Sequence, residues 1–314
     1  MKIAFMGTPE FALPSLQMLI DEGHEIAVFT QPDRPRDRGH GLAMPPVKEL
    51  ALRYGLPVFQ FEKIRSNEGL EALRELAPEL MVTAAFGQIL SAENLAVPKN
   101  GCINVHGSLL PRYRGAAPIQ WSVINGERVT GVTTMMTDIG LDTGDILMQR
   151  ETEIGPDETS GELYARLAVM GAELLRDTIA ALKDGSLTRT PQDEALASKC
   201  GTIKKEMARI DFDNSAKEIH DLVRGMDPAP VAFTVLDGAN IKIYKTRLAH
   251  EYDGAFDEAE NGQCVIAKSK SGLFVKCGGG SVLELVELQF AGTKRMPAKA
   301  ALNSRMLYNR VLGV

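Results

Sequence analysis

Residues 101–115 read Gly-Cys-Ile-Asn-Val-His-Gly-Ser-Leu-Leu-Pro-Arg-Tyr-Arg-Gly. The segment begins with the apolar run 101–105, typical of a buried strand, and continues into a loop punctuated by glycine and proline. Asn104 and His106 are two residues apart, so a strand conformation points both side chains to the same face of a sheet. An amide donor and an imidazole directed at one point are suited to stabilising negative charge on a carbonyl oxygen.

The sequence around this strand alternates short β-rich runs with helical patterns. We expect strands at 2–6, 25–30, 57–60, 80–85, 101–105 and 131–137. We expect helices at 10–22, 46–54, 67–77, 116–125 and 159–183. This alternation predicts an α/β domain with a Rossmann-like, mostly parallel sheet covered on both faces. The loop after the first strand, residues 7–11, lacks the dinucleotide fingerprint, which argues against NAD binding.

The C-terminal part has a different character. After a short helix expected at 214–225, short runs separated by Asp-Gly, Asn-Gly and Ser-Gly turns occur at 231–236, 241–247, 263–268, 272–277 and 281–289. This pattern predicts a small antiparallel, OB-like β-barrel, a fold that often binds nucleic acids. Because 314 residues are enough for two domains, we expect a catalytic domain over 1–190, a linker over 191–206 and the barrel over 207–314.

The composition is that of a folded globular protein, with 44% apolar and 24% charged residues. It contains no apolar run long enough to span a membrane, and its N-terminal apolar stretch is too short for a secretory signal. The four cysteines are scattered without a C-x-x-C pair, at 102, 200, 264 and 277. We therefore expect reduced thiols, no metal site and a cytoplasmic protein.

The charge is distributed unevenly along the chain. The formal net charge is −6, which by itself argues against a nucleic-acid partner. Residues 199–314, however, carry 17 Lys and Arg against 14 Asp and Glu, while residues 1–198 carry 18 against 27. A basic second domain leaves room for a polyanionic partner, although an uneven surface without a function is an equally simple interpretation.

A third polar group is expected near His106. Residues 101–137 read as strand, loop, helix and strand, which predicts one parallel βαβ unit. Parallel strands end at the same edge of a sheet, so the loop 137–145 should lie beside the loop after residue 105. Asp142 in that loop could orient His106 or accept a proton, and the alternative is that it caps its own tight turn.

Residues 104–115, together with Asp142-Thr-Gly-Asp145, resemble the signature of enzymes that transfer formyl groups from 10-formyltetrahydrofolate. The Ser-Leu-Leu-Pro core is shared by several members, including glycinamide ribonucleotide transformylase and a UDP-aminoarabinose formyltransferase. The chain is more specifically similar to the methionyl-tRNA formyltransferases at 7–12, 30–39, 46–48, 115–120 and 206–211. This resemblance covers essentially the whole chain.

The resemblance implies formyl transfer from 10-formyltetrahydrofolate, as a cosubstrate, to the α-amino group of initiator methionyl-tRNA for translation initiation. Asn104 and His106 would stabilise a tetrahedral intermediate with the assistance of Asp142, and no metal is required. An amino sugar nucleotide as acceptor is the alternative within enzymes. A catalytically silent folate- or RNA-binding protein is disfavoured because all three residues are present.

The resemblance also implies binding residues. The folate would be held by the loop residues Ser108, Leu109, Leu110, Pro111 and Arg112, with Phe86 and Gly87 across the cleft. Ordinary packing beneath a loop is the alternative for the two leucines.

The expected tRNA contacts are Arg34, Arg36 and Arg38 in the long loop 31–46, and Lys204, Lys205 and Lys245 in the barrel. Lysines expected after Gly39 are absent, and no tryptophan occurs in 227–233, which puts aromatic stacking on tRNA there in doubt. Nothing in the sequence suggests an obligate interface, so a monomer that contacts no membrane is expected.

Overall fold

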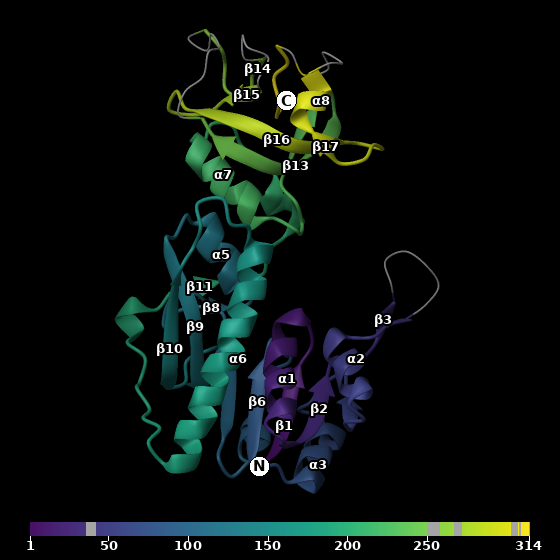
Figure 1. Cartoon of the computed structure of the whole chain (residues 1–314), viewed down its shortest axis with the longest axis vertical. Helices are drawn as coiled ribbons and strands as arrows, with labels where there is room; N and C mark the ends of the chain where they lie inside the picture. Colours follow the sequence, from purple (N-terminus) through teal and green to yellow (C-terminus); the bar gives the residue numbers. More distant parts are fainter. Residues whose placement is uncertain (36–41, 250–257, 267–271, 303–306, 308, 314) are drawn as a thin grey trace. The chain divides into compact units, whose positions relative to one another are not determined.

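The structure, a computed structural model of the chain, describes residues 1–35, 42–249, 258–266, 272–302, 307 and 309–313 (Figure 1). The chain forms two compact units. The first comprises Met1–Pro118, Val129–Glu153 and Tyr164–Cys200, and the second comprises Ile119–Arg128, Ile154–Leu163 and Gly201–Val314.

The first unit is built on a seven-stranded sheet with the order β10-β9-β7-β6-β1-β2-β5. Its strands are β1 (Lys2–Gly7), β2 (Glu25–Thr30), β5 (Val58–Gln60), β6 (Leu80–Ala84), β7 (Cys102–His106), β9 (Val129–Met136) and β10 (Ile146–Glu153). The first five run parallel, and their apolar runs suit strands that are covered on both faces. The predicted Rossmann-like, mostly parallel sheet is therefore confirmed.

Helices cover both faces of this sheet (Figure 1). They are η1 (Glu10–Ala12), α1 (Leu13–Asp21), α2 (Pro46–Arg53), α3 (Asn67–Leu76), α4 (Ala92–Leu95) and the greater part of α6 (Ser160–Asp184). On one face Phe29 and Met81 pack with Leu73 of α3 in a buried cluster. On the other face α6 approaches β7 closely, because a Cβ at Gly171 would come within 2.7 Å of Val105 Cγ1. The core thus lies on both sides of the sheet.

The direction of β9 differs from the prediction for 101–137. β9 pairs with β7 in antiparallel fashion, with Asn104 opposite Met135 and His106 opposite Thr133. A parallel return requires a crossover helix packed on the sheet. The helix between these strands, α5 (Pro118–Ile124), belongs to the second unit from Ile119 onward, so the predicted βαβ crossover is wrong.

Two short strand pairs complete the first unit. β3 (Arg34–Pro35) pairs with β4 (Leu42–Ala43), and β8 (Arg114–Gly115) pairs in parallel with β11 (Lys199–Cys200). A short 3-10 helix, η2 (Glu194–Leu196), precedes β11. The second pair joins the loop after β7 to a segment more than eighty residues later in the chain.

The second unit contains α5, α7 (Ala216–Gly225) and an antiparallel sheet with the order β12-β13-β16-β15-β14. The remaining elements are η3 (Lys205–Ala208), β12 (Phe233–Leu236), β13 (Ala239–Leu248), β14 (Cys264–Ile266), β15 (Leu273–Lys276), β16 (Val282–Phe290), β17 (Met296–Pro297) and α8 (Ala298–Leu302). α7 begins at a capping box between Ser215 and Glu218, and its buried residues pack with those of the sheet in one core. The predicted antiparallel, OB-like domain is confirmed. Among the helices described, none is long and apolar enough to cross a membrane.

Candidate active site

The sequence-predicted polar residues meet at the carboxyl end of β7. The alternation of this strand places Asn104 and His106 on the face that also carries Thr83 of β6, its register partner. β2 and β5 lie on one side of β1, whereas β6 and β7 lie on the other side, so the strand order reverses between β1 and β6. Open α/β sheets bind ligands at the carboxyl ends of the strands beside such a reversal. The site therefore lies at the sheet edge where folds of this kind bind ligands.

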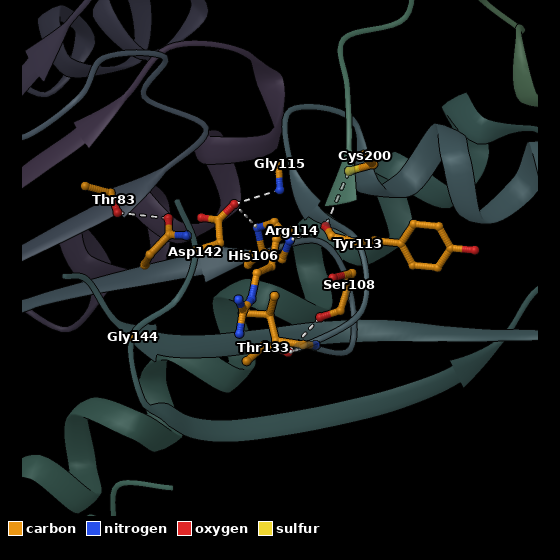
Figure 2. Close-up of polar contacts among 12 residues, drawn as sticks. Thr83, His106, Ser108, Tyr113, Arg114, Gly115, Thr133, Asp142, Gly144 and Cys200 are labelled. Atoms are coloured by element: carbon orange, nitrogen blue, oxygen red, sulfur yellow. Dashed lines mark hydrogen bonds and ion pairs between the residues drawn. The ribbon is translucent and has the colours of Figure 1, made fainter. Parts of the chain in front are cut away.

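His106 is buried and its two ring nitrogens face different partners (Figure 2). Nε2 lies 3.0 Å from the carbonyl oxygen of Tyr113. Because a carbonyl oxygen only accepts, Nε2 carries the hydrogen of this bond. Nδ1 lies 3.8 Å from Oδ2 of Asp142, so Nδ1 is the nitrogen that faces the carboxylate.

Asp142 comes from the loop between β9 and β10 and reaches His106 although β9 runs in the direction opposite to that predicted. Its Oδ2 accepts a hydrogen bond of 2.9 Å from the backbone N–H of Gly115. Its φ of 52° lies in the left-handed region, which a non-glycine residue adopts at a cost. The turn is capped instead by Asp138, whose Oδ1 accepts from the Gly140 N–H at 3.0 Å. The carboxylate of Asp142 is thus directed at the site and not at its own turn.

The amide of Asn104 is oriented by a neighbouring hydroxyl. Thr83 Oγ1 donates to Asn104 Oδ1 over 2.9 Å, which fixes the other end of the amide as the NH₂ group. Within the described part of the chain, Nδ2 of Asn104 has no hydrogen-bond partner. Both N–H groups of the Asn104 amide are therefore available as donors at the end of β7. Thr83 was not predicted as a site residue, although it is the one residue with a hydroxyl group in the apolar run 80–84.

Polar groups hold the loop 107–113 in place, and only some of its residues are accessible to a ligand. Ser108 is buried and its hydroxyl donates to the Arg112 carbonyl over 2.7 Å, which closes the loop. Leu110 is also buried, and its N–H donates to Thr133 Oγ1 over 3.1 Å. Leu109 and Pro111 are half-buried and Arg112 is exposed, so these three are the accessible residues of the predicted folate-binding segment 108–112.

Phe86 and Gly87 follow β6 at the same edge of the sheet. The Phe86 carbonyl accepts from Thr8 Oγ1 over 2.9 Å, and the Gly87 carbonyl accepts from Gln31 Nε2 over 3.0 Å. Gly87 is exposed with φ of 78°, a conformation that favours glycine. The loops after β1, β2 and β6 are thereby tied together beside the candidate site.

A buried thiol lies beside the His106 partner. Cys200 Sγ donates to the Tyr113 carbonyl over 3.4 Å (Figure 2). Burial raises the pKa of the Cys200 thiol, and the negative charge of Asp142 raises it further. The thiol therefore stays protonated and supports the carbonyl that also accepts from His106.

The predicted tRNA residues lie in different parts of the chain. Arg34 in β3 forms a two-point ion pair with Glu62, with distances of 3.2 and 2.8 Å. Arg36 and Arg38 lie outside the described residues. Lys204 and Lys205 at the beginning of η3 and Lys245 on β13 are exposed.

The surface of β13 also carries an aromatic group that sequence reasoning missed. The Arg295 guanidinium lies 4.3 Å from the centre of the Tyr244 ring, and Tyr244 Oη donates to Gln289 over 2.8 Å.

In the described ranges, no group of three or more His, Cys, Asp or Glu side chains is arranged to hold a metal.

Both parts of the chain match known families. The family described as "Formyl transferase" matches residues 1–179, and that described as "Formyl transferase, C-terminal domain" matches residues 202–306. The chain belongs to the formyl transferase family.

Individual relatives narrow this assignment. The methionyl-tRNA formyltransferase of Ruminiclostridium cellulolyticum is 53% identical over 300 residues, which cover 95% of each chain. That of Geotalea daltonii is 51% identical over 299 residues, covering 95% of this chain and 93% of the relative. At these identities the chain groups with the methionyl-tRNA formyltransferases within the family.

Solved structures share the fold at much lower identity. The sugar 3N-formyltransferase WlaRD, determined with dTDP and 5-N-formyl-THF, has a TM-score of 0.68 at 21% identity and covers 94% of this chain and 99% of its own. HypX from Aquifex aeolicus in complex with tetrahydrofolic acid has a TM-score of 0.65 at 16% identity, over 97% of this chain and 47% of its own. At these identities the likeness shows the fold alone.

Proposed function

We infer that this enzyme transfers the formyl group of 10-formyltetrahydrofolate to the α-amino group of methionyl-tRNA for translation initiation. The observation that carries the chemistry is the convergence of the Asn104 amide, His106 and Asp142 at one strand end. The high identity to methionyl-tRNA formyltransferases over nearly the whole chain supports the choice of acceptor. In the reaction a bond forms between the amine nitrogen and the formyl carbon, the bond from that carbon to folate N10 breaks, the amine loses a proton, and N10 gains one as tetrahydrofolate leaves.

The residues present suit such a donor. A formyl group brings a carbonyl oxygen that needs hydrogen-bond donors as it gains negative charge, and Nδ2 of Asn104 is a donor without a partner among the described residues. Leu109 and Pro111 offer half-buried apolar surface for a flat ring, and the Phe86 and Gly87 loop lies along the same sheet edge. We assign folate binding to this loop and to residues 108–112.

His106 has one nitrogen left for the substrate. Since Nε2–H is used by the Tyr113 carbonyl, a hydrogen bond to the formyl oxygen has to come from Nδ1. A ring that donates from both nitrogens carries a positive charge, and the Asp142 carboxylate 3.8 Å away stabilises that charge. Asp142 also provides the acceptor toward which the proton of the attacking amine can leave.

Asn104→Asp tests the role of the amide donor. The aspartate keeps an oxygen for the Thr83 hydroxyl but replaces the free NH₂ group by a second oxygen. We expect the kcat of formyl transfer to fall by about 10²–10³, as loss of one oxyanion donor does, with little change in KM for either substrate. Asn104→Ala should be equally slow. A near-normal kcat in Asn104→Asp would show that the amide serves only to bind Thr83.

The acceptor is held, in this proposal, by the arginine loop 31–46 and by the basic residues of the second unit, Lys204, Lys205 and Lys245. The support is the exposure of Arg34 and of the three lysines, together with the excess of basic residues in 199–314. We assign catalysis to residues 1–190, a linker to 191–206 and tRNA binding to 207–314, in an enzyme that acts as a cytoplasmic monomer. Sedimentation of the purified chain tests the oligomeric state, and a dimer would contradict it.

A further inference from the structure

Residues 191–200, here called the strap, follow α6 and return to the edge of the sheet that carries His106. The strap is tied to the loop after β7 by backbone bonds, since the Arg114 N–H donates to the Ser198 carbonyl over 2.8 Å. The Ser198 hydroxyl accepts from the Tyr113 N–H over 2.9 Å. These contacts hold Tyr113, whose carbonyl accepts the His106 hydrogen bond.

Gln192 of the strap bonds the backbone of the turn that carries Asp142. Its amide nitrogen Nε2 donates to the carbonyl oxygens of Asp142, at 2.8 Å, and Gly144, at 2.7 Å. Both hydrogens of the amide are thereby used on the turn that carries the Asp142 carboxylate. Its Oε1 accepts from Arg114 Nε over 3.0 Å, which fixes which end of the amide faces the turn.

The turn needs support from outside. Asp142 has a left-handed φ of 52°, which a side-chain-bearing residue keeps only where its surroundings enforce it. Gly144 lies so close to the strand that a Cβ there would come within 1.7 Å of the Met136 carbonyl oxygen. Gln192 binds the turn on both sides of Thr143, and is placed to enforce this conformation.

Arg114 anchors Gln192 in turn. The guanidinium is buried and forms a two-point pair with Glu194, at 2.7 and 3.0 Å. The bond from Arg114 lowers the pKa of the Glu194 carboxyl, so the pair persists at neutral pH. The next residue, Gly115, donates its N–H to the Asp142 carboxylate. The same short strand therefore holds Asp142 directly and through Gln192.

We propose that Gln192 is a positioning residue, which keeps the carboxylate of Asp142 directed at His106 by holding the backbone of the 142–144 turn. The inference rests on the proposed function, because it acts through the role assigned there to Asp142. It predicts a defect in turnover and not in substrate affinity, since both ends of the Gln192 amide are already bonded to protein groups.

The test is Gln192→Glu, a substitution of the same shape that keeps the bond from Arg114 but cannot donate to the two carbonyls. We expect kcat to fall by about 10–100-fold, the effect of a small misplacement of a catalytic group, with KM for both substrates within about twofold of wild type. Gln192→Ala, which adds no charge, should show the same loss and decides the question if the glutamate variant does not fold. Gln17→Ala, which removes a half-buried side chain whose amide bonds Asp21 and the Tyr54 hydroxyl, is the control and should match wild type.

A double variant separates positioning from a general structural effect. If Gln192 acts through Asp142, Gln192→Glu combined with Asp142→Asn should be no slower than Asp142→Asn alone. Losses that multiply, or a near-normal kcat in both single Gln192 variants, would overturn the inference. A wild-type enzyme that forms no formyl-methionyl-tRNA would instead overturn the proposed function.

Discussion

The amide of Asn104 is directed by one hydroxyl, that of Thr83 on the neighbouring strand. Thr83 is buried, and its register partner on β7 is Asn104 itself. Without this bond, the amide would be free to turn its oxygen toward the substrate, where it would oppose the developing negative charge. A buried hydroxyl on the neighbouring strand thus sets the polarity of the site.

Thr83→Val tests this control of the amide. Valine has the shape of threonine but cannot donate, and a hydrogen bond of this kind contributes about 0.5–1.5 kcal/mol. We expect kcat to fall by up to about tenfold, the factor that corresponds to about 1.4 kcal/mol, with KM unchanged. Thr83→Ser keeps the hydroxyl and should retain most of the activity. Equal losses in the valine and serine variants would point to packing as the cause.

At the scale of elements, the strands and helices that a local pattern defines could be predicted from the sequence. β2 was predicted with its bounds, and the helix predicted at 159–183 is present as α6, which begins at a capping box between Thr159 and Glu162 with bonds of 2.9 and 3.2 Å. The direction of β9 could not be predicted, because it depends on whether α5 packs on the sheet or elsewhere. β10 was missed because three apolar residues, 146–148, are followed by five polar residues, without the alternation that predicts a half-buried strand.

The residues of the site also differ in this respect, because some follow from a local pattern and others depend on contacts between distant segments. Asn104 and His106 could be predicted to share a face, because strand periodicity is local. The approach of Asp142 was predicted from a wrong topology and depends on contacts from Gly115 and Gln192. The strap pairs with β8 across more than eighty residues, and no periodicity in the sequence reveals such a pairing.

The exposed face of β13 provides a test of the nucleic-acid assignment. Lys245 lies opposite Glu287 in the sheet, but Glu287 is held by Arg295 at 2.5 and 2.7 Å. Among the residues described, Lys245 has no ion-pair partner, so its charge is available to a phosphate.

We expect Lys245→Ala to raise the KM for methionyl-tRNA and to reduce the slope of log affinity against log salt by about one, with the KM for folate unchanged. Lys99→Ala is the matched control, because Lys99 is exposed just before β7, at the opposite end of that strand from the candidate site. An unchanged tRNA affinity and salt slope in Lys245→Ala would remove this residue from the tRNA surface.

The whole molecule consists of two units with separate cores, which carry different kinds of residues. The first unit carries the polar residues at the carboxyl ends of β6 and β7, and the second carries the exposed basic residues of η3 and β13. The excess of acidic residues in 1–198 and of basic residues in 199–314 fits this division. The proposed function therefore assigns the chemistry to the first unit, and it divides recognition of the anionic substrate between the loop 31–46 of that unit and the basic residues of the second.

We infer that this site transfers the formyl group to methionyl-tRNA. The most direct measurement offers the purified enzyme labelled 10-formyltetrahydrofolate together with charged initiator methionyl-tRNA, and UDP-4-amino-4-deoxyarabinose as a rival acceptor. We predict that label appears on the tRNA and that His106→Ala abolishes this transfer while the variant remains folded. Label on the sugar nucleotide alone, or on neither acceptor, would contradict the claim.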